Sequence, residues 1–196
     1  RLDKGLDEIM KNMRKTTRYM IRRGDSMGIK IVRTDKLLDL NKFMKIYEET
    51  AQMKNFVPHS HIKQEFEEFI NIGKSFLYLA YGKKKLLAGA LITYYGNQAI
   101  YRHGATFRIG RKTSASYLLQ WEAIKDAKEK GLGIYNFFGI AKDENKNDPW
   151  YGLSQFKIGF GGERNDFIHS LDLPIKKKYW VTFLIDYLMR LKKGYL

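Results

Sequence analysis

The stretch SFLYLAYGKKKLLAGALITYYGNQAIYRHGA, residues 75–105, constrains the fold of this chain more than any other feature. Its apolar segments are separated by short turns at Gly82-Lys83 and Gly96-Asn97. Apolar runs of strand length between glycine-containing turns are typical of β-strands that follow each other in an antiparallel meander. Because a meander must bury at least one face, the pattern also requires helices or a second sheet to cover it.

Helical and strand patterns flank the meander on both sides. Helical spacing of apolar residues occurs in six segments, residues 3–25, 35–54, 59–72, 114–130, 152–160 and 176–196. Two further segments read as strands, GIKIVR at residues 28–33 and GIYNFFGI at residues 133–140. This order predicts an α/β fold with one mixed sheet flanked by helices, as in acyltransferases with a GNAT-like fold, and with helices at both ends of the chain.

Composition excludes several classes of site. The chain has 196 residues, of which 44% are hydrophobic, which is enough for one domain with a substantial core. The absence of cysteine excludes disulfides, thiolate zinc sites and a cysteine nucleophile, and it fits a reducing cytoplasm. Four scattered histidines have no metal-ligand spacing, so we expect neither a metal nor another cofactor. No signal peptide and no run of 18 apolar residues is present.

The formal net charge is +15 and the isoelectric point is about 9.8. Such an excess favours a polyanionic partner, which leaves nucleic acid, anionic lipid or phosphorylated small molecules as candidates. Solubility alone is the competing interpretation of the charge. The chain starts with Arg1 rather than methionine, and we expect it to be the C-terminal part of a longer protein.

The segment SQFKIGFGGE, residues 154–163, concentrates three glycines in four positions. We predict a helix that ends near Phe160, with Gly161 or Gly162 in the left-handed conformation that favours glycine at a helix C-terminus. Gly159 would then permit close packing or the approach of a ligand. A purely structural cap, with Lys157 in solvent, is the alternative.

Several of these segments together resemble the Fem family of aminoacyltransferases. The resemblance is carried by TTRYMIRRGDSMG, YRHGAT, GIYNFFGI and WYGLSQFKIGFGGE followed by LDLP, in that order along the chain. It implies transfer of an amino acid from aminoacyl-tRNA to the stem peptide of a peptidoglycan precursor, in the synthesis of interpeptide bridges. It also implies three parts: a basic helix (1–27) that leads from an absent first domain, a GNAT-like domain (28–175), and a basic amphipathic helix (176–196) packed on that domain.

The resemblance also implies roles for single residues. It makes Phe156 and Lys157 catalytic, with Tyr101 close to the reacting groups. The three glycines Gly159, Gly161 and Gly162 are expected to leave room for substrate. A phosphate-contacting arginine is expected after the second helix of the domain, but this chain has VPHSHIK there, which offers His59, His61 or Lys63.

Basic side chains near the start have the phosphates of tRNA as a candidate partner. The residues expected to bind tRNA are Arg14, Lys15, Arg18 and Arg22, although a solvated helix face would look the same. Lys176–Lys178 before the last helix are candidates for contact with anionic lipid that carries the precursor. The expected location is the cytoplasm, with peripheral contact at the inner face of the plasma membrane.

Two other functions stay open. A GNAT enzyme that uses acyl-coenzyme A would hold the pyrophosphate with a glycine-rich loop before the main helix. In the corresponding RIGRKTSAS segment, Arg111 and Thr113 occupy the two glycine positions counted from Arg108, which disfavours coenzyme A. A non-catalytic RNA- or membrane-binding module would need only the charge.

Overall fold

The computed structural model describes residues 1–54, 56–142, 145–168 and 171–193. The chain divides into two compact units, Arg1–Glu163 and Arg164–Leu196. The first unit contains a mixed sheet and the helices that pack on it, and the second contains helix α7 (Tyr179–Lys193).

Five strands form the sheet in the order β1-β2-β3-β4-β5. They are β1 (Lys30–Thr34), β2 (Ser75–Gly82), β3 (Lys85–Tyr95), β4 (Gln98–Thr106) and β5 (Ile134–Asn136). The first four strands pair antiparallel, and β5 joins β4 in parallel, which confirms the predicted mixed sheet. The turn after β2 lies one residue later than predicted, because Lys83 and Lys84 are the two residues with positive φ.

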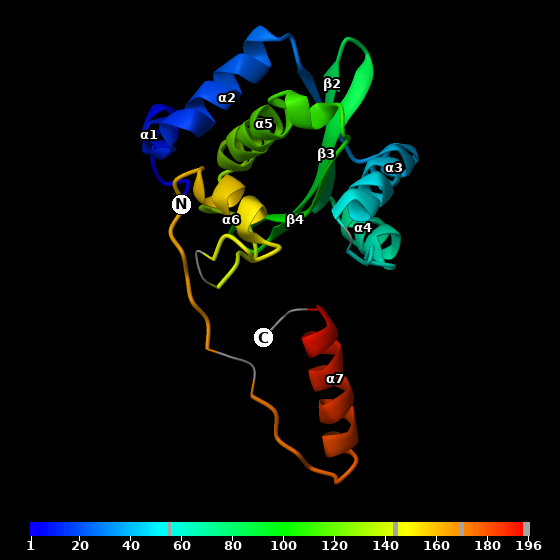
Figure 1. The fold of residues 1–196 in the computed structure, drawn as a ribbon. Coiled ribbons are helices and arrows are strands. Elements are labelled where there is room, and N and C mark those ends of the chain that lie inside the picture. The colour runs from blue at the N-terminus through cyan, green and yellow to red at the C-terminus, as the bar shows by residue number, and fades with distance from the viewer. Residues whose placement is uncertain (55, 143–144, 169–170, 194–196) are drawn as a thin grey trace. The chain divides into compact units, whose positions relative to one another are not determined.

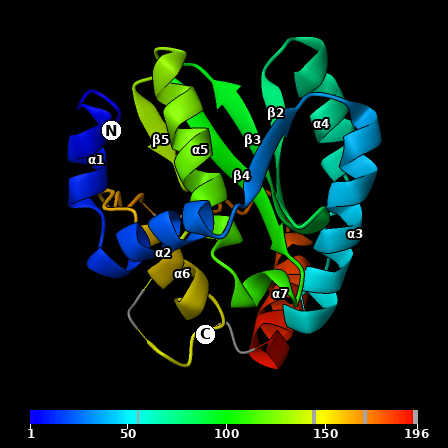
Figure 2. The same cartoon turned by 90° about the horizontal axis from the view of Figure 1, so that it is seen from above.

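Helices cover both faces of the sheet (Figure 1 and Figure 2). On one face lie α1 (Leu6–Asn12), α2 (Lys15–Ser26) and the long α5 (Ala115–Glu129). On the other face lie α3 (Leu37–Lys54) and α4 (Ile62–Asn71). A 3-10 turn (Gly110–Lys112) precedes α5, and α6 (Tyr151–Ile158) follows β5.

Alternate side chains of each strand point to opposite faces of the sheet, so they belong to two separate hydrophobic cores. Phe76 and Tyr78 of β2 join the core beneath α5, whereas Leu77 and Leu79 join the core beneath α3 and α4. Both cores contain large apolar side chains with little or no exposed surface, each of which stabilises the fold by roughly 1.5–3 kcal/mol. The central sheet is therefore held from both sides.

The leading helix predicted over residues 3–25 is two helices. The backbone is extended at Met13 and Arg14, where α1 ends and α2 has yet to begin. Met13 is buried, and the guanidinium of Arg18 donates hydrogen bonds to carbonyl oxygens of Lys11 and Met13 at the end of α1. Glycine favours the end of a helix, yet α2 continues through Gly24 to Ser26.

Gly24 has a packing role instead. A Cβ atom at this position would lie 3.0 Å from the Cβ of Leu118, so the glycine lets α2 approach α5 closely. The extended residues between α1 and α2 also allow close packing. The N–H of Arg14 is not used within a helix, so it is free to contact the end of α6. Tertiary packing has overridden the continuous helical periodicity of this segment.

Helix α7 confirms the predicted helical periodicity over Tyr179–Lys193, whereas residues 176–178 precede the helix. Residues 194–196 of the predicted helix lie outside the described residues. Within the part of the chain that the structure describes, no helix combines the length and the apolar character needed to cross a bilayer. The packing of α7 on the preceding domain, and the three-part division of the chain, stay predictions.

Candidate active site

The pairing between β4 and β5 is short. Three residue pairs join these strands, and the last of them is Ile100 with Asn136. After this pair, β4 continues to Thr106, whereas the chain leaves β5 in a loop that leads to α6. Tyr101 is thus the first residue of β4 beyond the paired segment, and its ring lies near Phe137 of the loop after Asn136 and near Lys157 of α6.

The loop after β5 is tied to its neighbours by hydrogen bonds. The N–H of Phe138 donates to Oδ1 of Asn136 at 2.8 Å, and the N–H of Ala141 donates to Oγ of Ser154 in α6 at 2.7 Å. Phe138 has φ +62°, a conformation that costs a non-glycine residue about 1–3 kcal/mol. Such strain is retained only where surrounding contacts hold it, and it is concentrated at functional sites.

Lys157 of α6 points into the fold rather than into solvent. Only 7% of its surface is exposed, and its Nζ donates a hydrogen bond of 2.6 Å to the carbonyl oxygen of Gly139. The same ammonium lies 5.8 Å from the centre of the Tyr101 ring. Among the residues that the structure describes, no carboxylate forms a salt bridge with it. The alternative of a solvated Lys157 is therefore wrong.

The surroundings of Lys157 set its electrostatics. Burial lowers the pKa of Lys157 to about 8, because the charged form loses hydration that no anion replaces. Burial raises the pKa of Tyr101, so its phenol stays neutral around pH 7. At neutral pH the site therefore holds an ammonium that titrates just above neutrality, next to an uncharged phenol.

Aromatic rings form the apolar wall beneath α6. Phe156 packs edge to face against Tyr117 at 4.9 Å and against Phe160 at 5.4 Å, both measured between ring centres. Phe137 connects this wall to Tyr101, with ring centres 6.2 Å apart. Phe156 thus lies beside Lys157 in sequence but belongs to the half-buried wall that seats the helix.

Two of the three glycines at the end of α6, Gly159 and Gly161, allow helices to pack closely. Helix α6 ends at Ile158 with Gly159 as its right-handed C-cap, two residues earlier than predicted. The predicted left-handed conformation is confirmed at Gly161, with φ +78°, and a Cβ atom there would collide with the backbone carbonyl of Asn12. A Cβ atom on Gly159 would lie 2.5 Å from Oγ1 of Thr17. The carbonyl of Gly159 accepts a 2.9 Å hydrogen bond from the N–H of Arg14. The room expected for substrate beside these two glycines is filled by the leading helices, because α6 is pressed against them. Gly162 has open space beside it, and its contact with substrate stays a prediction.

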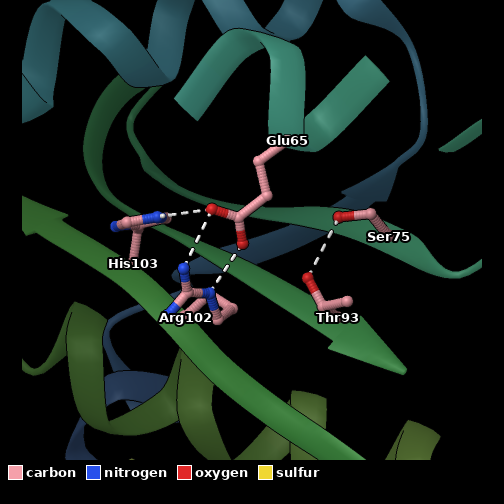
Figure 3. A network of polar contacts seen from close by, with 5 residues as sticks. All are labelled: Glu65, Ser75, Thr93, Arg102 and His103. Carbon is pink, nitrogen blue, oxygen red and sulfur yellow. Dashed lines mark hydrogen bonds and ion pairs between the residues drawn. The ribbon is translucent and has the colours of Figure 1, made fainter. Parts of the chain in front are cut away.

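A charged network lies on the opposite face of the sheet, between α4 and β4 (Figure 3). The guanidinium of Arg102 donates two hydrogen bonds to the Glu65 carboxylate, Nε to Oε1 at 2.6 Å and Nη2 to Oε2 at 3.0 Å. His103 Nε2 lies 3.5 Å from Oε2 of the same carboxylate. Burial on its own would raise the pKa of Glu65, but Arg102 and His103 together bring it below its ordinary value.

A β-bulge explains how adjacent residues of β4 serve both faces. Ile92 of β3 pairs with Tyr101 and Leu91 pairs with His103, so Arg102 is an extra residue in the ladder. Because the bulge shifts the alternation, Tyr101 faces α5 and His103 faces α3 and α4. Tyr101 lies over Gly104, whose missing side chain leaves the space that its ring occupies.

The substitutes for the expected arginine lie on the α4 face. The ring centre of His59 is 5.4 Å from that of His103, so His59 borders the charged network. Lys63 is exposed and forms an ion pair of 3.8 Å with Glu67 on the next turn of α4. Neither residue contacts Lys157 in the described structure, and their role in substrate binding stays a prediction.

The basic residues near the start of the chain differ from one another. Arg14 is exposed, and its Nη1 donates a 2.7 Å hydrogen bond to Oε1 of Gln155 in α6. Arg18 is engaged with the end of α1, which gives it a structural role in the helix break. Lys15 and Arg22 are exposed on α2. Binding of tRNA by these four residues stays a prediction.

Sequence reasoning missed the partners of the site. Glu65, Arg102 and His103 were not selected, although the adjacent Arg102 and His103 lie inside the YRHGAT block. Gly139, the acceptor for Lys157, was also missed, since a backbone carbonyl has no signature in sequence. The available signal was the pair of polar residues in a strand otherwise rich in small and apolar residues.

Comparison with known proteins supplies the family. The model of the FemAB family matches residues 2–81 and 59–186, which together cover most of the chain. This chain belongs to the FemAB family. A curated relative, the aminoacyltransferase FemA of Staphylococcus aureus, is 26% identical over 149 residues. That match covers 74% of this chain and 35% of FemA, so the chain spans about a third of the relative's length.

Solved structures confirm the fold of this FemAB member. A crystal structure of FemX matches 82% of this chain and 56% of its own, with a TM-score of 0.74 at 18% identity. An aminoglycoside acetyltransferase from a soil metagenome matches 76% of this chain and 97% of its own, with a TM-score of 0.54 at 17% identity. The predicted acyltransferase-like α/β fold is thereby confirmed.

Proposed function

We propose that this chain is the part of a FemAB aminoacyltransferase that positions the activated amino acid for transfer from aminoacyl-tRNA to the stem peptide of a peptidoglycan precursor. The observation that carries the proposal is the buried ammonium of Lys157, held by a backbone carbonyl beside Tyr101. A cation without a carboxylate partner keeps its charge available for a substrate oxygen.

The chemistry needs such a charge. The amine of the acceptor peptide attacks the carbonyl carbon of the ester that links the amino acid to the terminal ribose. A C–N bond forms and the carbonyl oxygen becomes an oxyanion, which the Lys157 ammonium stabilises. Collapse breaks the C–O bond, and the proton lost by the amine goes to the departing ribose oxygen. Loss of one such donor typically lowers the rate roughly 10²- to 10³-fold.

Tyr101 fits the proton transfer in this reaction. Its phenol stays protonated because burial raises its pKa, and its ring faces the ammonium. A neutral phenol next to the reacting atoms relays the proton from the attacking amine to the ribose oxygen. In this proposal Phe156 supports α6, and Lys157 and Tyr101 act on the substrate.

The acceptor end of tRNA would reach the site past exposed aromatic rings. Phe138 is 55% exposed and Trp150 is 45% exposed, and a Trp150 ring carbon would lie 3.7 Å from a Cβ placed on Gly139. Stacking of a base on an aromatic ring contributes about 1–3 kcal/mol. Arg14, Lys15 and Arg22 would meet the tRNA backbone, Arg14 next to α6 through Gln155.

The acceptor substrate would use the other side of β4. His59 and Lys63 are the candidates for the phosphates of the precursor, and Gly162 offers open backbone beside α6. We further propose that the chain acts with an upstream domain at the cytoplasmic face of the plasma membrane. Lys176–Lys178 before α7 would then contact anionic lipid.

The decisive experiment uses the full-length protein that contains this chain. Purified protein is given charged tRNA and a muramyl pentapeptide precursor, and formation of the branched peptide is followed by mass spectrometry. We expect transfer by the wild type and a loss of roughly 10²- to 10³-fold in Lys157→Met. The matched control is Lys125→Met, which removes a partly exposed lysine paired with Glu122 on α5 and should leave the rate unchanged.

Two results would contradict the proposal. If the intact protein does not use charged tRNA, or if Lys157→Met and Lys125→Met transfer equally fast, the assigned chemistry is wrong. Equal loss of RNA binding in both variants, without any transfer, would favour the non-catalytic module. The membrane proposal is tested by sedimentation with vesicles that contain an anionic lipid, with neutral vesicles as the control.

Acyl-coenzyme A is a weaker second candidate. The fold is shared with acetyltransferases, but the loop before α5 has little to offer a pyrophosphate. The N–H groups of Arg111, Thr113 and Ala115 already donate within this loop, to Phe107, Gly110 and the Thr113 hydroxyl. Calorimetry with acetyl-coenzyme A should therefore detect no binding, and micromolar affinity would reverse the preference.

A further inference from the structure

The loop that holds Lys157 is in contact with the charged network on the other face of the sheet. The guanidinium carbon of Arg102 lies 5.1 Å from the centre of the Phe138 ring, within the range of a cation–π contact. Phe138 is the residue with positive φ, and the next residue, Gly139, accepts the hydrogen bond of Lys157. A continuous set of contacts therefore runs from Glu65 to Arg102, Phe138, Gly139 and Lys157.

Phe138 needs an external support. With 55% of its surface exposed, burial contributes little to its position, and its left-handed backbone is unfavourable by itself. One support is the hydrogen bond to Asn136, which in turn donates to Gln98 at 3.1 Å. The other is the Arg102 guanidinium above its ring.

Arg102 is well suited to this role because it is itself fixed. Two parallel hydrogen bonds to Glu65 orient the plane of the guanidinium, which a lysine at the same position would not allow. Glu65 is further restrained by His103. The bulge in β4 places this fixed group on the α4 face while Tyr101 stays on the face of Lys157.

We propose that Glu65 and Arg102 are positioning residues, which hold Phe138 and thereby aim the Gly139 carbonyl at the Lys157 ammonium. In the described residues, the hydrogen bonds, ion pairs and ring contacts of the two side chains do not include Lys157, so the pair acts through the loop. The consequence for the site rests on the proposed function, but the contacts do not. If the pair is broken, the loop relaxes, the carbonyl turns away and water reaches the ammonium.

The test measures the state of Lys157 itself. The titration of Lys157 is followed by NMR of side-chain carbon and nitrogen in the full chain. Tyr101, the titratable side chain next to it among the described residues, stays neutral through this range because burial raises its pKa. In Glu65→Gln and in Arg102→Lys, the midpoint should move upward by at least about one pH unit, because rehydration restores the ordinary pKa of an amine. A matched control is Arg33→Lys.

Arg33 offers the same kind of arrangement at the other edge of the sheet. It pairs with Asp126 at 3.9 Å and lies 3.8 Å over the ring of Phe76. Loss of that pair should lower stability without moving the titration of Lys157. A purely structural role for Arg102 would make the two substitutions behave alike, and that result would overturn the proposal.

A second variant covers the case in which the substitutions unfold the chain. Phe138→Gly removes the ring but accepts positive φ without strain, so it should fold. Because it removes the support and leaves the pair intact, Phe138→Gly by itself should move the midpoint of Lys157 upward. Where Glu65→Gln folds, adding it to Phe138→Gly should move the midpoint no further. A midpoint that moves equally with and without the Phe138 ring would show that the pair does not act through this loop.

The outcome is separate from that of the proposed function. If the midpoint moves as expected but charged tRNA supports no transfer, the positioning stands and the assigned reaction fails. If transfer depends on Lys157 but the midpoint ignores Glu65 and Arg102, the reaction stands and the positioning fails.

Discussion

Two cationic side chains, Arg102 of strand β4 and Lys157 of helix α6, have opposite electrostatic environments. Arg102, on the α4 face, is bound by both oxygens of the Glu65 carboxylate, which raises its pKa. Lys157, on the α5 face, has a backbone carbonyl as its hydrogen-bond partner, and burial lowers its pKa to about 8. The two faces of one sheet therefore hold a neutralised charge and an uncompensated charge.

The difference suits Arg102 to a structural role and Lys157 to a chemical one. A paired guanidinium is stable and oriented, but its field is largely cancelled by the carboxylate. An ammonium against a carbonyl keeps its field and is poised to lose its proton near neutral pH, at a cost in stability. Removal of the lysine charge should therefore change stability at alkaline pH, whereas removal of the carboxylate should change it at acid pH.

Disturbing the packing of α6 against the first two helices should have the largest effect, because α6 carries Lys157. In Gly161→Ala, positive φ and the Asn12 carbonyl oppose the new methyl group, so we expect a loss of about 3 kcal/mol in the free energy of unfolding. Gly162→Ala, with open space and no positive φ, should change it by less than about 0.5 kcal/mol. Urea unfolding of both variants measures the difference, and equal losses would refute the packing role of Gly161.

Removing the uncompensated charge should change how stability depends on alkaline pH. Since the folded pKa of Lys157 is lowered to about 8, the unfolded chain binds more protons above that pH, and stability rises until the unfolded lysine also titrates. Lys157 should thus add roughly 2 kcal/mol of stability between pH 8 and pH 10. In Lys157→Met this rise should disappear from urea unfolding curves recorded across that range.

The same lysine also predicts a pH dependence of activity. If the ammonium stabilises the oxyanion, transfer should fall as pH rises through about 8. Lys157→Arg keeps a charge at all these pH values and should lose this alkaline limb, even if its rate at pH 7 is lower. Rate profiles of the full-length protein between pH 6.5 and pH 9.5 provide the measurement, and identical profiles would argue against a role for the charge.

Removing the paired carboxylate should act at acid pH. The pKa of Glu65 is lowered in the fold, so its stabilisation is present above the ordinary range of a glutamate and is lost as pH falls through the folded value. Glu65→Gln should flatten this acid loss by about 1 kcal/mol. If the pair also positions the loop that holds Lys157, the same variant should reduce the alkaline rise, because the folded pKa of Lys157 then moves back toward its ordinary value. Thermal unfolding from pH 3 to pH 7 tests the sign.

An exposed pair on the same helix should have the smallest effect. Lys63 and Glu67 are one helical turn apart at 3.8 Å, and such pairs contribute about 0.2–0.5 kcal/mol. Lys63→Ala should therefore leave unfolding almost unchanged. Weaker binding of the precursor by the full-length variant would support the proposed substrate role, and unchanged binding would remove Lys63 from the site.

Much of the fold was predictable because its signals are local. The meander, the helices and the left-handed glycine after α6 follow from periodicity and from the backbone freedom of Gly161, which neighbouring residues in sequence specify. The resemblance selected Lys157 and Tyr101, and the structure brings these two side chains together. The break between α1 and α2 was not predictable, because it depends on the approach of α6.

The sequence by itself determined most of the elements, apart from the break between α1 and α2, and it determined that a lysine follows an aromatic residue shortly before a group of glycines. Only the tertiary structure decided that this lysine is dehydrated against Gly139, and that Glu65 meets Arg102 from a helix 37 positions away. The physical reason is packing between distant segments: α4 brings a carboxylate to Arg102 and His103 of β4, whereas α6 places Lys157 against the loop after β5, where a backbone carbonyl is its partner.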